Sequence, residues 1–229
     1  MTFAVAMTSL ASLAMAQQPW DLRRFAKTAF FFNSPEEVLK RVPLPGRRAP
    51  TLGVDGELFS STAARPSLLQ FGPLDDVVMG GVSESTFTTD GVFSGVVSTD
   101  NNGGFAGCRS KALSPPLQLS SKSGLKMRVR GDSALRRYKA IVRDSYDWNG
   151  IAWSQSFDVP PAEWCDVDLP FDQFVPTLFA RTVPGGATVD KSQINTVQLT
   201  YSKFEYDSAL NPNFEAGPFE LQIENIRTY

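Results

Sequence analysis

The chain of 229 residues is 42% hydrophobic and 20% charged, a composition typical of a globular protein with one sizeable domain. Its net charge of −2 gives no positive field for a phosphate backbone, so nucleic acid is excluded as the expected partner. The sequence contains no histidine, which excludes Ser-His and Cys-His nucleophile pairs and every histidine-containing zinc site. We therefore assign no catalytic residue and expect a protein that is not an enzyme.

Residues 1–16 are predicted to be a targeting segment. They contain no charged side chain and end in Ala14-Met15-Ala16, which is typical of a cleavage site. The segment is shorter than the roughly 20 apolar residues that span a membrane. It also lacks the basic residues that begin a secretory signal, so a truncated or bipartite organelle presequence fits as well as a signal peptide. The pattern leaves open whether the segment is cleaved.

Residues 17–66 are predicted to form a helical leader followed by a strap rich in proline and glycine. Within residues 20–32 apolar side chains fall at near-helical spacing: Leu22, Phe25, Ala29 and Phe32. The basic side chains take the other side of this helix: Arg23, Arg24 and Lys27. Such a helix packs on its own domain or makes peripheral contact with a membrane or partner surface.

A second, short helix is predicted to begin after Ser34 and to end at about Arg41. Ser34 is the expected N-cap, a proline follows it, and Glu37 completes a capping box. Residues 43–66 then contain four prolines and three glycines, which predicts an irregular strap or linker.

Beyond residue 67 the hydrophobic period changes from helical to two, which is typical of β-strands. The candidate strands are residues 92–97, 105–110, 125–130, 138–143, 151–157, 164–169, 196–200 and 219–224. Short strands separated by Gly, Pro, Asn and Asp turns predict an all-β fold, an antiparallel β-sandwich over residues 67–229. The aromatic residues expected in its core are Trp153, Phe157, Trp164, Phe171, Phe174 and Phe219.

A series of motifs follows in a specific order. They are Asp76–Ser83 (Asp-Val-Val-Met-Gly-Gly-Val-Ser), Phe93-Ser94-Gly95, Gly103–Ser110, Leu125–Asp132, Leu169–Phe174 and Gly217–Phe219. In this order they resemble the CIA30 family, the complex I intermediate-associated protein 30 domain, over about residues 70–229. The resemblance implies a galactose-binding-like jelly roll and a non-enzymatic assembly factor, or chaperone, for membrane energy-transducing complexes, first the mitochondrial NADH:ubiquinone oxidoreductase.

The same resemblance implies protein partners, namely subunits of a membrane complex under assembly. No cofactor is expected, because the chain lacks the Gly-rich nucleotide-binding loop of the larger plastid relatives. Residues 20–35 resemble the leader that precedes this domain in photosynthetic relatives, which favours a plastid over a mitochondrion.

The signature residues allow two interpretations. In the structural one, the glycine pairs form tight turns, Asp76 accepts backbone N–H bonds, and Arg109 pairs with Asp76 or another carboxylate. In the functional one, polar residues line a groove for a partner or ligand. The candidate binding residues are Asp75, Asp76, Gly80, Gly81, Ser83, Asn101, Asn102, Gly104, Arg109 and Trp148.

Two alternative functions remain open at this stage. The loop Ser145–Gly150 offers the aromatic and polar side chains of a carbohydrate-binding module, unless Asn149-Gly150 forms a hairpin turn with Trp148 packed inward. A carboxylate-based hydrolase would use one of two aspartate pairs: Asp144 and Asp147, or Asp166 and Asp168.

Cys108 and Cys165 are the only cysteines. They are predicted to be small side chains on strands, with a single disulfide as the alternative. No metal is assigned, because no Asp-rich loop has the regular spacing of a dedicated calcium site.

Overall fold

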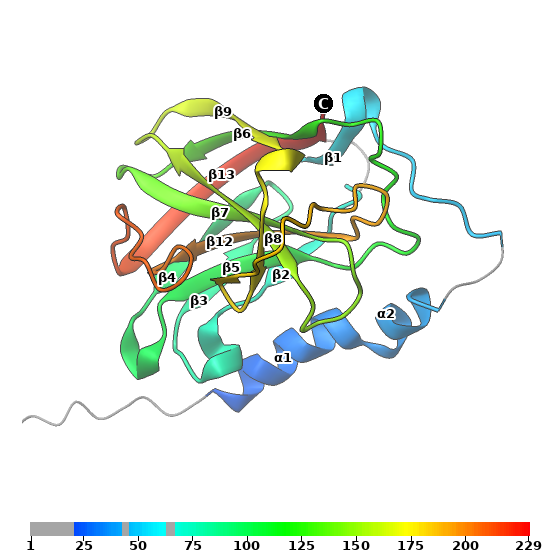
Figure 1. Cartoon of the computed structure of the whole chain (residues 1–229). Coiled ribbons are helices and arrows are strands. Elements are labelled where there is room, and N and C mark those ends of the chain that lie inside the picture. The colour runs from blue at the N-terminus through cyan, green and yellow to red at the C-terminus, as the bar shows by residue number, and fades with distance from the viewer. Residues whose placement is uncertain (1–20, 43–45, 63–66) are drawn as a thin grey trace, which may run out of the picture.

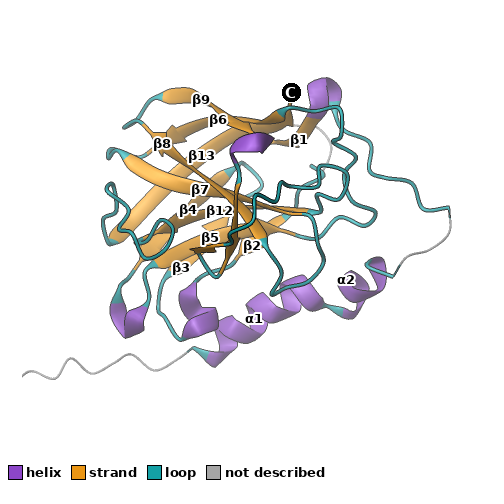
Figure 2. Cartoon of the chain, viewed as in Figure 1, coloured by secondary structure: helices purple, strands orange, loops and turns teal. Residues whose placement is uncertain are grey.

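The computed structural model describes residues 21–42, 46–62 and 67–229, so the predicted targeting segment and Trp20 lie outside the described residues. Two α-helices, α1 (Leu22–Asn33) and α2 (Pro35–Lys40), precede a sandwich of two antiparallel sheets (Figure 1). Both helices lie at one end of the sandwich, outside the two sheets (Figure 2). The predicted all-β sandwich with a short helical N-terminal extension is confirmed.

The first sheet has the order β3-β4-β13-β6-β9, with β1 paired to β13. Its strands are β1 (Glu57–Ser60), β3 (Glu84–Phe87), β4 (Val92–Val97), β6 (Gly124–Gly131), β9 (Trp164–Pro170) and β13 (Gly217–Thr228). The second sheet has the order β11-β10-β8-β7-β12-β5-β2. Its strands are β2 (Phe71–Pro73), β5 (Phe105–Ser110), β7 (Arg136–Arg143), β8 (Ala152–Val159), β10 (Val175–Leu178), β11 (Arg181–Thr182) and β12 (Thr196–Ser202).

All eight strands predicted from alternation are present, two of them, β4 and β5, with the predicted bounds. Strands β6 and β9 show why alternation succeeds. Their odd-numbered positions face the core, while the polar positions pair across the solvent face, Lys126 with Asp168 at 3.0 Å and Arg128 with Asp166 at 3.4 Å. The charges that mark these segments as strands therefore stabilise their pairing.

Large aromatic side chains fill the space between the sheets. Of the residues predicted there, five are at most 7% exposed: Trp153, Phe157, Phe171, Phe174 and Phe219. The prediction for Trp164 is wrong, since it is 40% exposed. Alternation along β9 places residue 164 on the solvent side with Asp166 and Asp168, and this pattern outweighs the hydrophobicity of a single tryptophan.

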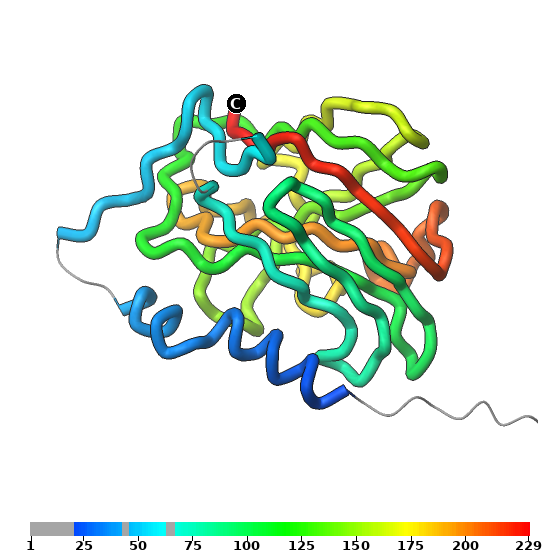
Figure 3. The backbone as a smooth tube through the Cα atoms, turned by 180° about the vertical axis from the view of Figure 1, so that it is seen from behind, coloured from blue at the N-terminus to red at the C-terminus, as the bar shows by residue number. Residues whose placement is uncertain are grey.

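The segment predicted to be an irregular strap contains a strand. β1 pairs antiparallel with β13, and its register shifts between Glu57 and Phe59. The shift leaves the adjacent residues Leu58 and Phe59 both buried, so the segment shows no alternation from which a strand could be predicted. Figure 3 shows the preceding residues 46–56 running along the outside of the sandwich towards β1.

Helix α1 packs on its own domain, one of the two predicted roles. Thr28 and Phe32 are buried, whereas Leu22 is 61% exposed. The side of the helix that contacts the sandwich therefore overlaps only partly with the predicted apolar side. Arg24, predicted on the outer side, instead reaches the sandwich and bonds to Asp75. Buried acceptors on the domain thus set the rotation of the helix.

Helix α2 begins as predicted. The Ser34 hydroxyl accepts a bond from the Glu37 amide at 3.4 Å, and the helix ends at Lys40 with Arg41 as its C-cap. Within the described ranges, no helix has both the length and the apolar content needed to cross a membrane.

We predict that Gly72→Ala loosens α1. A Cβ atom on Gly72 would lie 2.4 Å from the Phe31 ring of α1, so the helix has to move. We expect faster amide hydrogen exchange in α1 and a loss of about 1–3 kcal/mol in the free energy of unfolding. Phe31→Ala makes room for the new methyl group, so the double variant should lose less than the two single variants added together. Additive losses would contradict this account.

Candidate functional site

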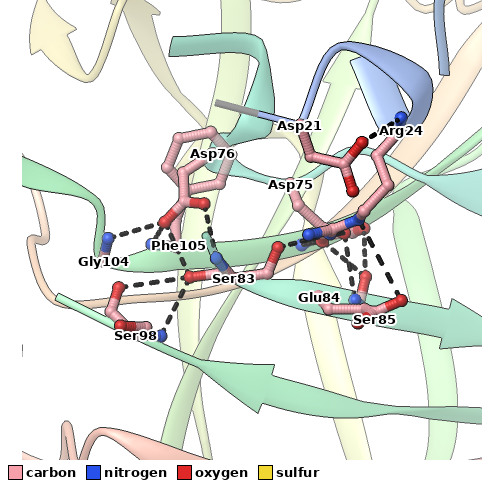
Figure 4. Close-up of polar contacts among 11 residues, drawn as sticks. Asp21, Arg24, Asp75, Asp76, Ser83, Glu84, Ser85, Ser98, Gly104 and Phe105 are labelled. Carbon is pink, nitrogen blue, oxygen red and sulfur yellow. Dashed lines mark hydrogen bonds and ion pairs between the residues drawn. The ribbon is translucent and has the colours of Figure 1, made fainter. Parts of the chain in front are cut away.

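The acidic pair of the signature lies where the connection from β2 to β3 forms a 3-10 turn, η2 (Asp76–Met79) (Figure 4). Asp75 is 2% exposed and its carboxylate points towards β3 and β5. It accepts the amide of Ser85 at 2.9 Å, the hydroxyl of Ser85 at 2.5 Å and the amide of Gly107 at 3.1 Å. Asp75 therefore joins the two sheets at this end of the sandwich.

Asp76 is 1% exposed and organises the neighbouring loop. One oxygen accepts the Ser83 amide at 2.9 Å. The other accepts the Ser83 hydroxyl at 2.6 Å and the amides of Gly104 and Phe105 at 2.8 and 3.3 Å. The Ser83 hydroxyl in turn accepts the Ser98 amide at 2.9 Å. The predicted role of Asp76 as an acceptor of backbone N–H groups is confirmed.

The glycines of the signature make room for Asp76. A Cβ atom on Gly81 would lie 2.3 Å from the Asp76 Cγ, and one on Gly103 would lie 2.4 Å from its Oδ2. Gly80 has φ +91° and ends η2 in the left-handed region, where a side chain is strained. Packing against the buried carboxylate thus requires Gly81 and Gly103, and the left-handed turn favours Gly80, as the structural interpretation expected.

Arg24 connects this network to α1. Its Nη2 donates to Asp75 Oδ2 at 3.2 Å and to the Ser83 carbonyl at 2.5 Å. Burial raises the pKa of the Asp75 carboxyl above its usual value of 3.8, and the Ser85 hydroxyl, two backbone amides and the Arg24 charge oppose the rise. The net effect is a raised pKa, so the folded chain is less stable with Asp75 ionised than with Asp75 protonated.

We predict a pH-dependent contribution from Asp75. Because its pKa is higher in the folded than in the unfolded chain, its contribution to stability is complete below pH 3.8 and is lost as the pH rises through the folded pKa. Asp75→Asn removes this titration and leaves the other groups in place. The difference in free energy of unfolding, wild type minus Asp75→Asn, should therefore shrink as the pH rises. A difference that grows with pH would show a lowered pKa instead.

The two asparagines lie in a second turn, η3 (Asp100–Asn102). Both have positive φ, 54° for Asn101 and 58° for Asn102. The Asn101 amide donates to the Gly80 carbonyl at 3.2 Å, which holds the two turns together, while Asn102 is exposed. Asn101 thus belongs with Asp76 and the glycines, and Asn102 faces solvent.

The predicted pairing of Arg109 with a carboxylate is wrong. Arg109 lies on β5 at 5% exposure, and among the described residues its guanidinium contacts two aromatic rings and no acid. Its Cζ lies 4.8 Å from the centre of the Phe32 ring and 3.9 Å from that of the Trp148 ring. Burial, together with the charges of Arg143 and Arg41, lowers the pKa of Arg109 to about 9. The partners of this residue come from α1 and a distant loop.

The loop Ser145–Gly150 also departs from its prediction. The Gly150 amide donates to the Asp147 carbonyl at 3.1 Å, so the turn is centred on Trp148 and Asn149, one residue before the expected Asn-Gly centre. Trp148 is 39% exposed and is therefore neither packed inward nor a free platform. Its ring holds Arg109 against α1.

Comparison with known proteins places these motifs in a family. The sequence matches the family described as Complex I intermediate-associated protein 30 (CIA30) over residues 59–223. The chain belongs to the CIA30 family. The match begins within β1, which agrees with the pairing of that strand to β13. No curated protein matches the sequence.

Two solved structures are similar in fold to this CIA30 domain. The family 11 carbohydrate-binding module from Clostridium thermocellum, in complex with a β-1,3-1,4-mixed-linked tetrasaccharide, superposes with a TM-score of 0.51 at 16% identity. The alignment covers 78% of this chain and 96% of that one. The same module of a cellulosomal cellulase from that organism gives 0.51 at 18% identity, covering 78% and 95%. These similarities establish a jelly-roll β-sandwich.

Nine of the ten candidate residues of this CIA30 domain fall into two groups, and Asn102 faces solvent apart from both. Those that the structure joins through Asp75 and Asp76 are Gly80, Gly81, Ser83, Asn101 and Gly104. Arg109 and Trp148 form a separate contact with Phe32. The role of both groups in binding stays a prediction.

Residues outside the prediction complete the network. Ser85 lies on β3, two positions after Ser83. Residues two apart in an extended segment point to the same side, so this spacing was a signal that both hydroxyls face the acidic pair. Arg24 had no such signal, because it is 51 residues from Asp75.

The other acidic and sulfur-containing candidates have surface or packing roles. Asp166 and Asp168 pair with cations, and Asp144 accepts the Trp153 indole N–H at 2.8 Å. Cys108 is buried on β5 and Cys165 is half-buried on β9, both as free thiols. In the part of the chain that is described, no three His, Cys, Asp or Glu side chains are grouped to hold a metal ion.

Proposed function

We propose that this CIA30 protein is a non-enzymatic assembly factor. Its client would be an intermediate of a membrane energy-transducing complex, either the NADH dehydrogenase (complex I) or a photosynthetic complex. The observation that carries the proposal is the family match over residues 59–223, which contains every motif of the signature. Because Asp75 and Asp76 satisfy internal bonds, their removal would act on client binding through stability.

The outward side of α1 is the proposed contact with the client or with the membrane beside it. Leu22 and Phe30 are 61% and 68% exposed there, next to the exposed cations Arg23 and Lys27. Exposed apolar residues beside basic ones favour peripheral binding to an acidic surface. We further propose a plastid as the compartment, on the resemblance of residues 20–35 to the leader of photosynthetic relatives.

The test is affinity purification of the tagged protein from its own organelles, followed by native gels and mass spectrometry. The proposal expects subunits of NADH dehydrogenase or a photosystem in bands of subcomplex size. Leu22→Ser/Phe30→Ser should lose them while unfolding like the wild type. The matched control, Arg128→Ser, changes a half-buried residue on the solvent side of the six-stranded sheet and should keep them. A monomer without any membrane-complex subunit would contradict the proposal.

The second candidate is a carbohydrate-binding module. It is favoured by the 39% exposure of Trp148, since exposed aromatic rings stack on sugars. One contact of that ring is already taken by Arg109, which leaves less surface for a ligand. A glycan array without hits would remove this candidate, and binding lost in Trp148→Ala but kept in Trp164→Ala would promote it.

A further inference from the structure

Three arginines from separate segments meet beside the outer face of the seven-stranded sheet. Arg41 follows α2, Arg109 lies on β5, and Arg143 ends β7. Together with Thr196 of β12 they line a pocket of about 20 Å³. Thr196 pairs directly with Arg143 across the β7–β12 ladder, which fixes both on the same face of the sheet.

Several donors of this pocket have no acceptor among the described residues. They are the Nε atoms of Arg41, Arg109 and Arg143 and the hydroxyl of Thr196. Arg109 is 5% exposed and Thr196 is 4% exposed, so bulk water has little access to accept hydrogen bonds from them. Buried polar groups are normally paired, and an unpaired charged donor is the most costly exception. The arrangement therefore favours a ligand that supplies acceptors.

The charges of the pocket indicate the sign of that ligand. Among the residues that line it, Asp147 is the one acid against three arginines. The Asp147 Oδ1 already accepts the Asn149 amide at 3.0 Å. The aromatic rings beside Arg109 attract its charge but provide no hydrogen-bond acceptor in place of a carboxylate. Burial is the main cause of the lowered Arg109 pKa, and the charges of Arg143 and Arg41 add to it by a repulsion that a bound negative charge would relieve.

We propose that this pocket binds a small oxyanion, a carboxylate or phosphate group, through the unpaired donors of Arg109, Arg143 and Thr196. Guanidinium groups are the side chains best suited to both oxyanions, because their N–H groups match the spacing of the oxygens. A volume of about 20 Å³ admits one or two oxygens of such a group but not a sugar ring or a nucleobase.

The first experiment is isothermal titration of the full chain with sodium phosphate and, separately, with sodium acetate, at ionic strength held constant by sodium chloride. Saturable binding of one or both anions is expected, with a rise in thermal midpoint that follows occupancy. Acetate binding alone identifies a carboxylate ligand, and phosphate binding alone a phosphate ligand. No saturable binding of either anion beyond the chloride background would overturn the proposal.

Two variants place the binding in this pocket. Thr196→Val removes a hydroxyl that has no partner but keeps the side-chain shape, so the chain should fold with unchanged stability and bind the anion several-fold more weakly. Arg143→Gln removes a charge-assisted donor and should weaken binding about tenfold or more. Arg137→Gln is the matched control, an arginine on the same strand that is paired with Asp158 at 2.7 Å. Equal affinities in all three variants would overturn the assignment.

Discussion

Asp76→Ala is expected to lower the free energy of unfolding by about 4 kcal/mol, because two buried amides, the half-buried Phe105 amide and one hydroxyl lose their acceptor together. Each buried donor left unpaired costs roughly 1–3 kcal/mol, and local movement of the two turns recovers part of the sum. Domains of this kind are stable by only about 5–15 kcal/mol, so the variant should fold with a small margin. Denaturant unfolding followed by tryptophan fluorescence measures the loss.

The matched control for this prediction is Asp168→Ala. Asp168 is an aspartate on strand β9 that pairs with Lys126, but its side chain is 55% exposed. Exposed ion pairs contribute little, so a loss below about 1 kcal/mol is expected. If both variants lost the same stability, the bonds to Asp76 would not be what holds the two turns together.

Phe219→Ala is expected to cost about 3–5 kcal/mol, whereas Trp164→Ala should cost less than about 1 kcal/mol. Both residues were predicted in the core, but Phe219 is 3% exposed and Trp164 is 40% exposed. The Phe219 ring packs against Phe93 and Tyr201 with centroid distances of 5.0 and 5.3 Å, so its removal leaves a cavity between the sheets. Comparing the two variants therefore tests whether burial, and not aromatic character alone, decides the loss of stability.

The measurement is thermal and denaturant unfolding of the two variants. The denaturant data also give the slope of the free energy of unfolding against denaturant concentration. An unchanged slope confirms that a difference in midpoint is a difference in stability. A Trp164→Ala loss as large as that of Phe219→Ala would contradict the assignment of Trp164 to the solvent side of β9.

The Asp75 network has a consequence for α1. Arg24 is the one basic residue of the helix that bonds to buried acceptors, while Arg23 and Lys27 stay exposed. The helix is therefore fixed to the sandwich by Arg24, Phe31 and Phe32, while Leu22 and Phe30 are exposed. This division should allow the proposed binding side to be altered without loosening the domain.

Several features were predictable because they depend on neighbours along the chain. Alternation of hydrophobic and polar residues is local, so it identified the eight strands and the faces of β6 and β9. Capping is local too, which is why Ser34 was interpreted correctly. The role of Asp76 was predicted from turn chemistry, although its carboxylate accepts bonds from Ser83, Gly104 and Phe105, which lie 7, 28 and 29 positions further along the chain. β1 was missed because its bulge removes the alternation.

The residue pattern alone was enough to predict the fold class, the family resemblance and the role of Asp76 as an acceptor of backbone amides, whereas Asp75 was predicted only as a candidate binding residue. Only the tertiary structure decided that Arg24, and not Arg109, pairs with Asp75, and that Arg109 meets Phe32, Trp148 and two further arginines. The reason is physical. Local patterns record which side of an element is buried, whereas the partner of a buried charge depends on which distant segments folding brings within a few ångströms.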